Sequence, residues 1–276
     1  MAKEIKTPFM VDRPMSFCPG CGHGVTIRLI TECLEELGQI DNVIFPLGVG
    51  CSSLLGGGLE ADRLHCAHGR AGAVATAIKR CNPHNVVIAY QGDGDAYSIG
   101  VGESTSAAYR NENFTVIVIN NTNYGMTGGQ MSNCTLPGQK TSTTTHGRDP
   151  SRSGQPFRFP ELVANQFPAA AYVARGSVSN PKNIRTLKKY IKNAIEAQLN
   201  NEGYSLVEVL SPCPTNWHQT GPEALKHLDE AVQKFFPLGE FKKRGENKMP
   251  LPDAAAATQS EAAAAGLAAA PVGASA

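Results

Sequence analysis

The sequence has little that would draw the protein to a charged partner or into a membrane. Its 276 residues carry 25 basic and 24 acidic side chains, for a formal net charge of +1. Such an even balance gives no long-range attraction to nucleic acid. No apolar run approaches the roughly 20 residues that cross a bilayer. The N-terminal segment also lacks the apolar core of a signal peptide. We therefore expect a cytoplasmic protein that binds neither nucleic acid nor membrane.

A second paired cysteine knuckle, which structural zinc sites usually have, is also missing. The chain has eight cysteines but only one CxxC pair, Cys18 and Cys21, while Cys51 and Cys213 stand alone in Gly- or Pro-rich segments. Thiols of a cytosolic protein stay reduced, so clustered cysteines indicate metal binding or chemistry rather than disulfides. A thioredoxin-like redox pair would follow a strand, and none is predicted before Cys18. Zinc, an iron–sulfur cluster and coincidence all remain open on this pattern alone.

Short apolar strands alternate with helices along most of the chain. Strands are predicted over 42–48, 86–90, 115–120 and 204–210, and helices over 25–38, 71–81, 98–109, 181–199 and 223–236. This alternation predicts an α/β fold, a parallel sheet with helices on both faces. Residues 125–157 are rich in Gly, Thr, Ser and Pro and predict a long functional loop. We expect one domain over 1–245, followed by a disordered Ala/Pro-rich tail over 246–276.

Polar residues follow two of the predicted strands directly. Asp93 lies between Gly92 and Gly94 after one strand, and Asn120 and Asn121 end the next, with 25 residues between Gly94 and Asn120. Each motif alone is also typical of an ordinary turn. Together they place oxygen ligands for a hard cation such as Mg²⁺ at neighbouring strand ends, where α/β sheets bind ligands. Glycine there lets backbone N–H groups approach a diphosphate.

Six motifs in order resemble the beta subunit of 2-oxoacid:ferredoxin oxidoreductases, a thiamine-diphosphate-binding family. They are CPGCGH (18–23), GVGCSS (48–53), HGR (68–70), QGDGDAYSIG (91–100), NNTNYGMTGGQ (120–130) and SPCPTNW (211–217). The resemblance covers roughly residues 10–240. It implies the thiamine-diphosphate-binding fold and one [4Fe–4S] cluster, and it assigns Cys18, Cys21, Cys51 and Cys213 as the cluster ligands.

The same resemblance implies the residues around the cofactor. Asp93 and Asn121 would ligate Mg²⁺ through their side chains, and Asn123 through its backbone carbonyl. Contacts to the cofactor are implied for a larger set: Gly92, Asp93, Gly94, Asp95, Asn121, Asn123, Ser52 and Ser53. His68 and Arg70 are the expected catalytic residues, because the family's HGR run borders cofactor and substrate and a guanidinium pairs well with an anion.

The implied reaction is the oxidative decarboxylation of a 2-oxoacid with coenzyme A. The products would be an acyl-CoA, CO₂ and two electrons, which would pass through the cluster to ferredoxin. The chain has no CxxCxxCxxxCP run, so ferredoxin-like clusters would lie on another polypeptide. Thiamine enzymes also need a glutamate from a pyrimidine-binding domain. We therefore expect an obligate alpha subunit and small gamma or delta subunits.

The substrate is open between two 2-oxoacids. Some family members carry lysines at the positions of Leu54 and Gly128, where they could pair with the distal carboxylate of 2-oxoglutarate. Leu54 favours an uncharged branched-chain substrate such as 2-oxoisovalerate, whereas the YGMTGGQMS run over 124–132 also resembles 2-oxoglutarate-type chains. Tyr124, Thr127 and Gln130 either line the substrate pocket or form a plain Gly-rich loop.

Two other classes of protein explain part of the pattern. A non-oxidative thiamine-diphosphate-dependent decarboxylase or synthase would use the diphosphate motif and leave the four loop cysteines without a role. A zinc-stabilised binding module would use the cysteines and leave the diphosphate motif without one. Only an iron–sulfur thiamine enzyme uses both.

Overall fold

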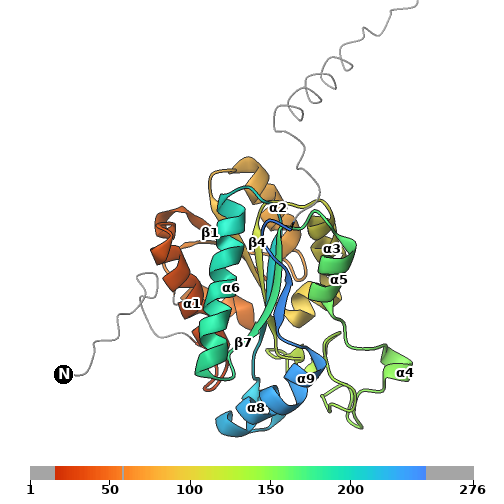
Figure 1. The fold of residues 1–276 in the computed structure, drawn as a ribbon. Coiled ribbons are helices and arrows are strands. Elements are labelled where there is room, and N and C mark those ends of the chain that lie inside the picture. Colours follow the sequence, from red (N-terminus) through yellow and green to blue (C-terminus); the bar gives the residue numbers. More distant parts are fainter. Residues whose placement is uncertain (1–15, 58, 247–276) are drawn as a thin grey trace, which may run out of the picture.

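The computed structural model describes residues 16–57 and 59–246, and its central feature is a seven-stranded sheet between helices (Figure 1). The strand order is β2-β1-β3-β4-β8-β7-β9. All neighbours pair in parallel except β7 and β9, which are antiparallel. The strands are β1 (Val43–Leu47), β2 (Asp62–His65), β3 (Val86–Gly92), β4 (Thr115–Asn120), β7 (Tyr172–Ser177), β8 (Ser205–Leu210) and β9 (Gly239–Lys242).

Helices cover both faces of this sheet, which confirms the predicted α/β class (Figure 1). One face carries α1 (His23–Glu36) and α6 (Pro181–Leu199), and the other carries α2 (Ala71–Cys81), α3 (Val101–Tyr109) and α5 (Phe159–Gln166). In the part of the chain that the structure describes, no helix is both long and apolar enough to cross a bilayer.

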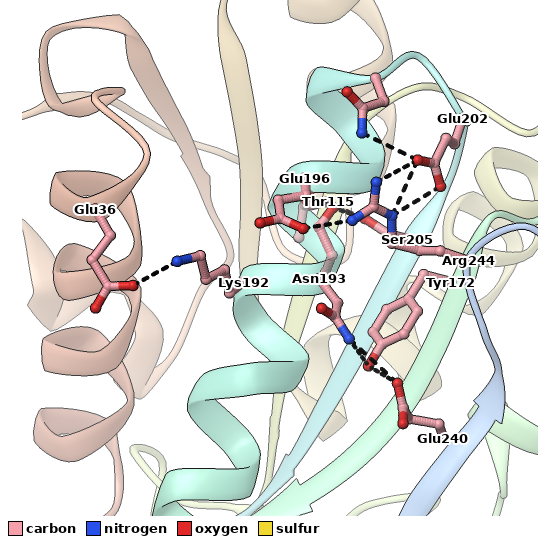
Figure 2. A network of polar contacts seen from close by, with 12 residues as sticks. Glu36, Thr115, Tyr172, Lys192, Asn193, Glu196, Glu202, Ser205, Glu240 and Arg244 are labelled. Carbon is pink, nitrogen blue, oxygen red and sulfur yellow. Dashed lines mark hydrogen bonds and ion pairs between the residues drawn. The ribbon is translucent and has the colours of Figure 1, made fainter.

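Helix α6 shows why these segments fold locally. Asn180 caps its first turn by accepting a hydrogen bond from the Asn183 amide, and Pro181 occupies the first helical position, where no N–H is needed. Lys192 and the neighbouring Lys188 pair with Glu36 of α1 at 2.8 Å, and the Lys192 pair is visible in Figure 2. These ion pairs tie the two helices together on one face of the sheet.

Short elements occupy the loops around the sheet. They are η1 (Ile40–Asn42), η2 (Cys51–Gly57), η3 (Gly94–Ile99), β5 (Asn123–Tyr124), β6 (Gln130–Met131), α4 (Pro150–Ser153), α7 (Pro214–Trp217), α8 (Gly221–His227), η4 (Leu228–Val232) and α9 (Gln233–Phe235). The strand 115–120 and the helices 71–81 and 181–199 have the predicted bounds. The helix predicted over 98–109 begins instead at Val101, because residues 94–99 form a π-helical turn. The predicted tail lies outside the described residues from 247 onward, and the 1–245 domain boundary stays a prediction.

The parallel pairing brings the carboxyl ends of the strands to one edge of the sheet. The chain runs from β1 outward to β2 and then returns to the other side of β1 as β3. This reversal makes a crevice between the loops that follow β1 and β3, which is where α/β sheets bind ligands. Cys51 follows β1, Asp93 follows β3, Asn121 follows β4 and Cys213 follows β8.

A buried ion-pair network lies next to the end of β4, where the loop that carries Asn121 begins. Arg175 on β7 and Glu208 on β8 are both fully buried and pair at 3.1 Å. Glu208 also accepts a hydrogen bond from Asn120 Nδ2 at 2.7 Å, and Arg175 reaches Glu161 on α5 at 2.7 Å. The network therefore fixes the last residue of β4, which directly precedes Asn121.

We expect Arg175→Met to lower the free energy of unfolding by about 3–5 kcal/mol, because it leaves the Glu208 carboxylate buried without a counter-charge. The matched control is Arg244→Met, whose guanidinium pairs with Glu196 and Glu202 at the surface (Figure 2). The control should cost less than about 1 kcal/mol, since water screens a partly exposed pair. Urea unfolding of both variants measures the difference, and equal losses would contradict the network's role.

Candidate functional site

A cavity of about 90 Å³ opens in the crevice at the carboxyl ends of β1, β3 and β4. Its walls come from loops that are far apart in the sequence, which the parallel sheet brings together. We call it the diphosphate cavity. It is lined by His23, Val49, Gly50, Cys51, Ser52, His68, Gly92, Asp93, Gly94, Asp95, Asn121, Asn123, Tyr124, Gly125, Met126 and Thr127.

Three oxygen-bearing groups converge in this cavity: the Asn121 side-chain amide, the Asn123 backbone carbonyl and the Asp93 carboxylate. The side-chain oxygen of Asn121 lies 2.7 Å from the backbone oxygen of Asn123 and 3.1 Å from Asp93 Oδ1. Turning the amide would let its nitrogen donate to both neighbours, whereas a bound cation needs the oxygen where it stands. Asn123 Oδ1 is also buried and has no hydrogen-bond partner among the described residues. The set matches the all-oxygen coordination that Mg²⁺ prefers, so the residues present fit the predicted metal.

Asp93 is held in place by a residue that the sequence did not reveal. Ser132 Oγ donates to Asp93 Oδ2 at 2.5 Å and accepts from the Cys134 amide at 3.1 Å, and both Ser132 and Asp93 are buried. Burial raises the pKa of the Asp93 carboxyl to about 7, against the lowering effect of the hydrogen bonds from Ser132 and the Asn121 amide. The only signal for Ser132 was its place at the end of the quoted 124–132 run.

We expect Ser132→Ala to weaken Mg²⁺ binding about 10–100-fold, the usual effect of removing a group that orients a metal ligand. Ser151→Ala is the matched control, because Ser151 lies in the same long loop but bonds only to Asp149. The measurement is the Mg²⁺ concentration that gives half-maximal retention of thiamine diphosphate. If the two variants bind Mg²⁺ equally well, the Ser132 hydrogen bond has no positioning role.

Asp95 and His68 form a pair at the edge of the diphosphate cavity. Asp95 accepts hydrogen bonds from His68 Nδ1 at 2.5 Å and from the amides of Gly69 and Val49 at 2.8 and 3.2 Å. Gln91 also donates to its second oxygen at 2.5 Å. The carboxylate is thus occupied by the protein and holds the loops after β1 and β2 together. Because Asp95 bonds to Nδ1 of His68, the other ring nitrogen, Nε2, makes no bond to this carboxylate.

The structure does not bring all predicted site residues into this cavity. Arg70 lies outside it, half exposed, and pairs with Glu103 on the surface. Ser53 bonds to the Gly50 carbonyl at 2.7 Å and does not line the cavity, whereas the buried Ser52 does. Gly94 does line the cavity, and a Cβ there would lie 2.4 Å from the Tyr124 ring. Only glycine, which has no Cβ, leaves room for the Tyr124 ring at this position.

A second cavity, of about 280 Å³, gathers the four predicted cluster ligands, and we call it the cysteine cavity. Two of its cysteines precede α1 and the others follow β1 and β8. Its lining is Phe17, Cys18, Cys21, Cys51, Leu54, Asn121, Gly125, Met126, Cys213, Pro214, Thr215 and Asn216. Within residues 16–57 and 59–246, no three His, Cys, Asp or Glu side chains form a group that could hold a single metal ion. The thiols instead surround a space, which fits a multi-atom cluster. Cys33 and Cys81 lie on α1 and α2, away from this cavity.

The electrostatics of the cysteine cavity reflect the closeness of its thiols. Burial first, and the neighbouring cysteines second, raise the pKa of the Cys51 thiol to about 12 and that of Cys21 to about 11. Without a metal these two thiols stay protonated at neutral pH. A bound cluster would compensate the buried negative charge and take up the thiolates.

The two cavities share a wall. Cys51, Asn121, Gly125 and Met126 line both of them. His23, two residues after Cys21, also reaches the diphosphate cavity and bonds through Nδ1 to Tyr90 Oη at 2.7 Å. Burial lowers the pKa of His23 to about 3, so its ring is neutral. Sequence reasoning missed His23 as a wall residue, because nothing in the CPGCGH motif indicates where its ring points.

Comparisons with known proteins agree with this geometry. Residues 48–209 match the family described as thiamine pyrophosphate enzyme, C-terminal TPP binding domain. The ketoisovalerate oxidoreductase subunit VorA of Methanothermobacter thermautotrophicus is 44% identical over 235 residues, which cover 85% of this chain and 49% of that protein. The 2-oxoglutarate synthase subunit KorB of Archaeoglobus fulgidus is 35% identical over 221 residues, covering 80% of this chain and 78% of that one.

A solved structure shares this fold. It is a 2-oxoglutarate:ferredoxin oxidoreductase from Magnetococcus marinus with 2-oxoglutarate, coenzyme A and succinyl-CoA bound. Its TM-score is 0.74 at 25% identity, and the match covers 98% of both chains. This chain spans about half the length of the ketoisovalerate relatives that it matches.

The fold, the strand-end cavity and its oxygen cluster define a thiamine-diphosphate-binding domain. Within this class of proteins, the two relatives are named as subunits of enzymes whose names specify a 2-oxoacid, ketoisovalerate or 2-oxoglutarate. The chain belongs to the 2-oxoacid:ferredoxin oxidoreductase family.

Proposed function

We propose that the chain is the beta subunit of a 2-oxoacid:ferredoxin oxidoreductase and catalyses, with partner subunits, the CoA-dependent oxidative decarboxylation of a 2-oxoacid. The products are an acyl-CoA and CO₂, and the electrons pass through a [4Fe–4S] cluster to ferredoxin. The observation that carries the proposal is the wall shared by the diphosphate cavity and the cysteine cavity. A cofactor and a cluster in these two places would be direct neighbours, as electron transfer between them requires.

Each cavity has residues suited to one bound group. Asp93, Asn121 and the Asn123 carbonyl would hold Mg²⁺ and, through it, the diphosphate. Cys18, Cys21, Cys51 and Cys213 would hold the cluster. When bound, thiamine diphosphate supplies the carbanion that attacks the 2-keto carbon and the ring that accepts the electron pair left by CO₂.

His68 is the protein group best placed to handle a proton beside the substrate. Asp95 fixes its ring through Nδ1 and so determines which nitrogen remains for the substrate. Its ring lies edge-on to Tyr124, with centroids 6.1 Å apart, which limits its rotation. Arg70 pairs with Glu103 at the surface. It would bind an anion of the substrate or cofactor only where a partner subunit completes that side of the site.

The substrate that the described site favours is a branched-chain 2-oxoacid such as 2-oxoisovalerate. None of the described residues that line either cavity is a lysine or an arginine. Met126, on the wall that both cavities share, is apolar and offers nothing to pair with the distal carboxylate of 2-oxoglutarate, whereas Leu54 lines only the cysteine cavity. Turnover of the two acids by the assembled complex tests this choice, and a higher kcat/KM for 2-oxoglutarate would contradict it.

Partner subunits are part of the proposal. Val49 and Met126 line the diphosphate cavity and are nevertheless exposed, at 39% and 47%, so an apolar rim surrounds its mouth. An alpha subunit carrying the pyrimidine-binding domain would cover this rim and supply the activating glutamate, and small gamma or delta subunits would carry electrons onward to ferredoxin. The chain by itself should show no turnover, and full activity of the isolated chain would overturn this part.

The content of the anaerobically purified protein separates the proposal from its rivals. Iron, acid-labile sulfide and thiamine diphosphate together, with a brown colour, support the oxidoreductase. Thiamine diphosphate without iron would indicate a non-oxidative decarboxylase or synthase. One zinc ion without thiamine diphosphate would indicate a zinc-stabilised binding module.

A further inference from the structure

A single helical turn connects the two cavities. α7 begins directly after Cys213, the cluster ligand that follows β8, and ends at Trp217, the only tryptophan of the chain. Trp217 Nε1 donates to the backbone oxygen of Asn121 at 3.2 Å. One end of the turn thus carries a cysteine of the cysteine cavity, and the other contacts a residue of the oxygen cluster.

Asn216 lies at the centre of this connection. Its Nδ2 donates to Cys213 Sγ at 3.3 Å and to the Gly125 carbonyl at 2.8 Å, and Gly125 belongs to the wall that both cavities share. The remaining side of the amide packs against Gly129, where a Cβ would come within 3.0 Å of Asn216. Both hydrogens of the amide nitrogen therefore have acceptors, and the side chain has one defined position.

We propose that Asn216 is a positioning residue that raises the reduction potential of the cluster by donating a hydrogen bond to the sulfur of Cys213, while it anchors that cysteine to the wall of the diphosphate cavity. This inference rests on the proposed function, because it needs a cluster on the four thiols.

The physical reason is the charge on the sulfur. Reduction adds one electron to the cluster, and part of the added negative charge resides on the cysteine sulfurs. An N–H donor stabilises the more negative, reduced form, so hydrogen bonds to sulfur shift the potential of iron–sulfur clusters upward. Cys213 is buried, so solvent competes little with this bond.

The surroundings make Asn216 the specific donor for this sulfur. Among the other side chains of α7, Pro214 has no donor and Trp217 donates to Asn121, whereas Thr215 lines the cysteine cavity but is exposed to solvent. Removing the Asn216 amide therefore removes the side-chain donor that α7 directs at the cluster ligand.

The test compares three variants of the assembled complex, purified without oxygen. Asn216→Leu keeps the branched shape that packs against Gly129 but loses the donor, and Asn216→Ala serves if the larger side chain prevents folding. His218→Asn is the matched control, because His218 follows α7 directly, is exposed and lines neither cavity. Each is titrated with reductant while the cluster's EPR signal is followed, and the wild-type trace identifies signals from partner subunits.

We expect both Asn216 variants to retain iron and to show a more negative midpoint potential for one cluster. The expected size is about a tenfold change in the equilibrium constant of reduction, which is about 59 mV for a one-electron couple. The potential of His218→Asn should equal that of the wild type. An unchanged potential in iron-replete Asn216→Leu and Asn216→Ala would overturn the inference and assign Asn216 to packing alone. Absence of iron from the wild-type complex would instead refute the proposed function.

Discussion

Replacing Cys213 with serine is expected to abolish the proposed oxidoreductase turnover of the assembled complex and to strip it of the proposed [4Fe–4S] cluster. Cys213 is one of four thiols around the cysteine cavity, and it is buried and fixed between β8 and α7. A serine hydroxyl does not replace a thiolate ligand to iron, because its oxygen is harder and far less acidic. Loss of one of four ligands from such a buried site should cost the whole cluster.

Iron and sulfide content, absorbance near 400 nm and turnover with ferredoxin measure this loss. Cys81→Ser is the matched control, since Cys81 is exposed at the end of α2 and lies away from the cysteine cavity. The control should retain iron and activity. A Cys213→Ser complex with full iron content would show that the cluster ligands lie elsewhere.

Asp93→Asn should remove Mg²⁺-dependent binding of thiamine diphosphate. The carboxylate is the only charged group in the oxygen cluster of Asp93, Asn121 and Asn123. An amide at this position keeps the shape but not the negative charge, so we expect affinity to fall by more than the 10–100-fold that is typical for outer-shell partners. Turnover should fall with it.

This variant separates binding from folding. Burial already disfavours the charged form of Asp93, as its raised pKa shows, so a neutral amide should not lower the free energy of unfolding. Thiamine content after purification in Mg²⁺ and urea unfolding of the same sample measure the two effects. Asp41→Asn, an exposed carboxylate on η1, is the control. Normal thiamine content in Asp93→Asn would exclude Asp93 as a metal ligand.

Several elements escaped sequence reasoning for physical reasons. β7 was not predicted because it contains Arg175, and a charged residue usually lies at the surface. In the structure this arginine is buried and pairs with Glu208 and Glu161. β2 is an edge strand whose four side chains are all exposed, so no apolar pattern marks it. β9 pairs antiparallel at the opposite edge, and α5 is only eight residues long. A pattern in one segment cannot reveal a pairing that depends on another.

The same distinction applies within the site. Arg70 was expected beside the substrate, but its side chain turns to Glu103 of α3. Asp95 was expected to contact the cofactor, and it lines the diphosphate cavity, where its oxygens also accept hydrogen bonds from His68, Gln91 and two backbone amides. Ser132 and Asn216 gained roles through contacts with residues 39 and 91 positions away. Side-chain direction and partner choice are set by packing, which local sequence does not encode.

The sequence by itself determined what depends on local order and spacing. Buried apolar runs made the strands, capped periodic segments made the helices, and the residues that follow each strand were bound to reach one edge of a parallel sheet. Only the tertiary structure decided which atoms meet at that edge: that the oxygens of Asp93, Asn121 and Asn123 converge, and that the four thiols enclose a space beside them. Those meetings are contacts between distant segments, and they exist only once the whole sheet has formed.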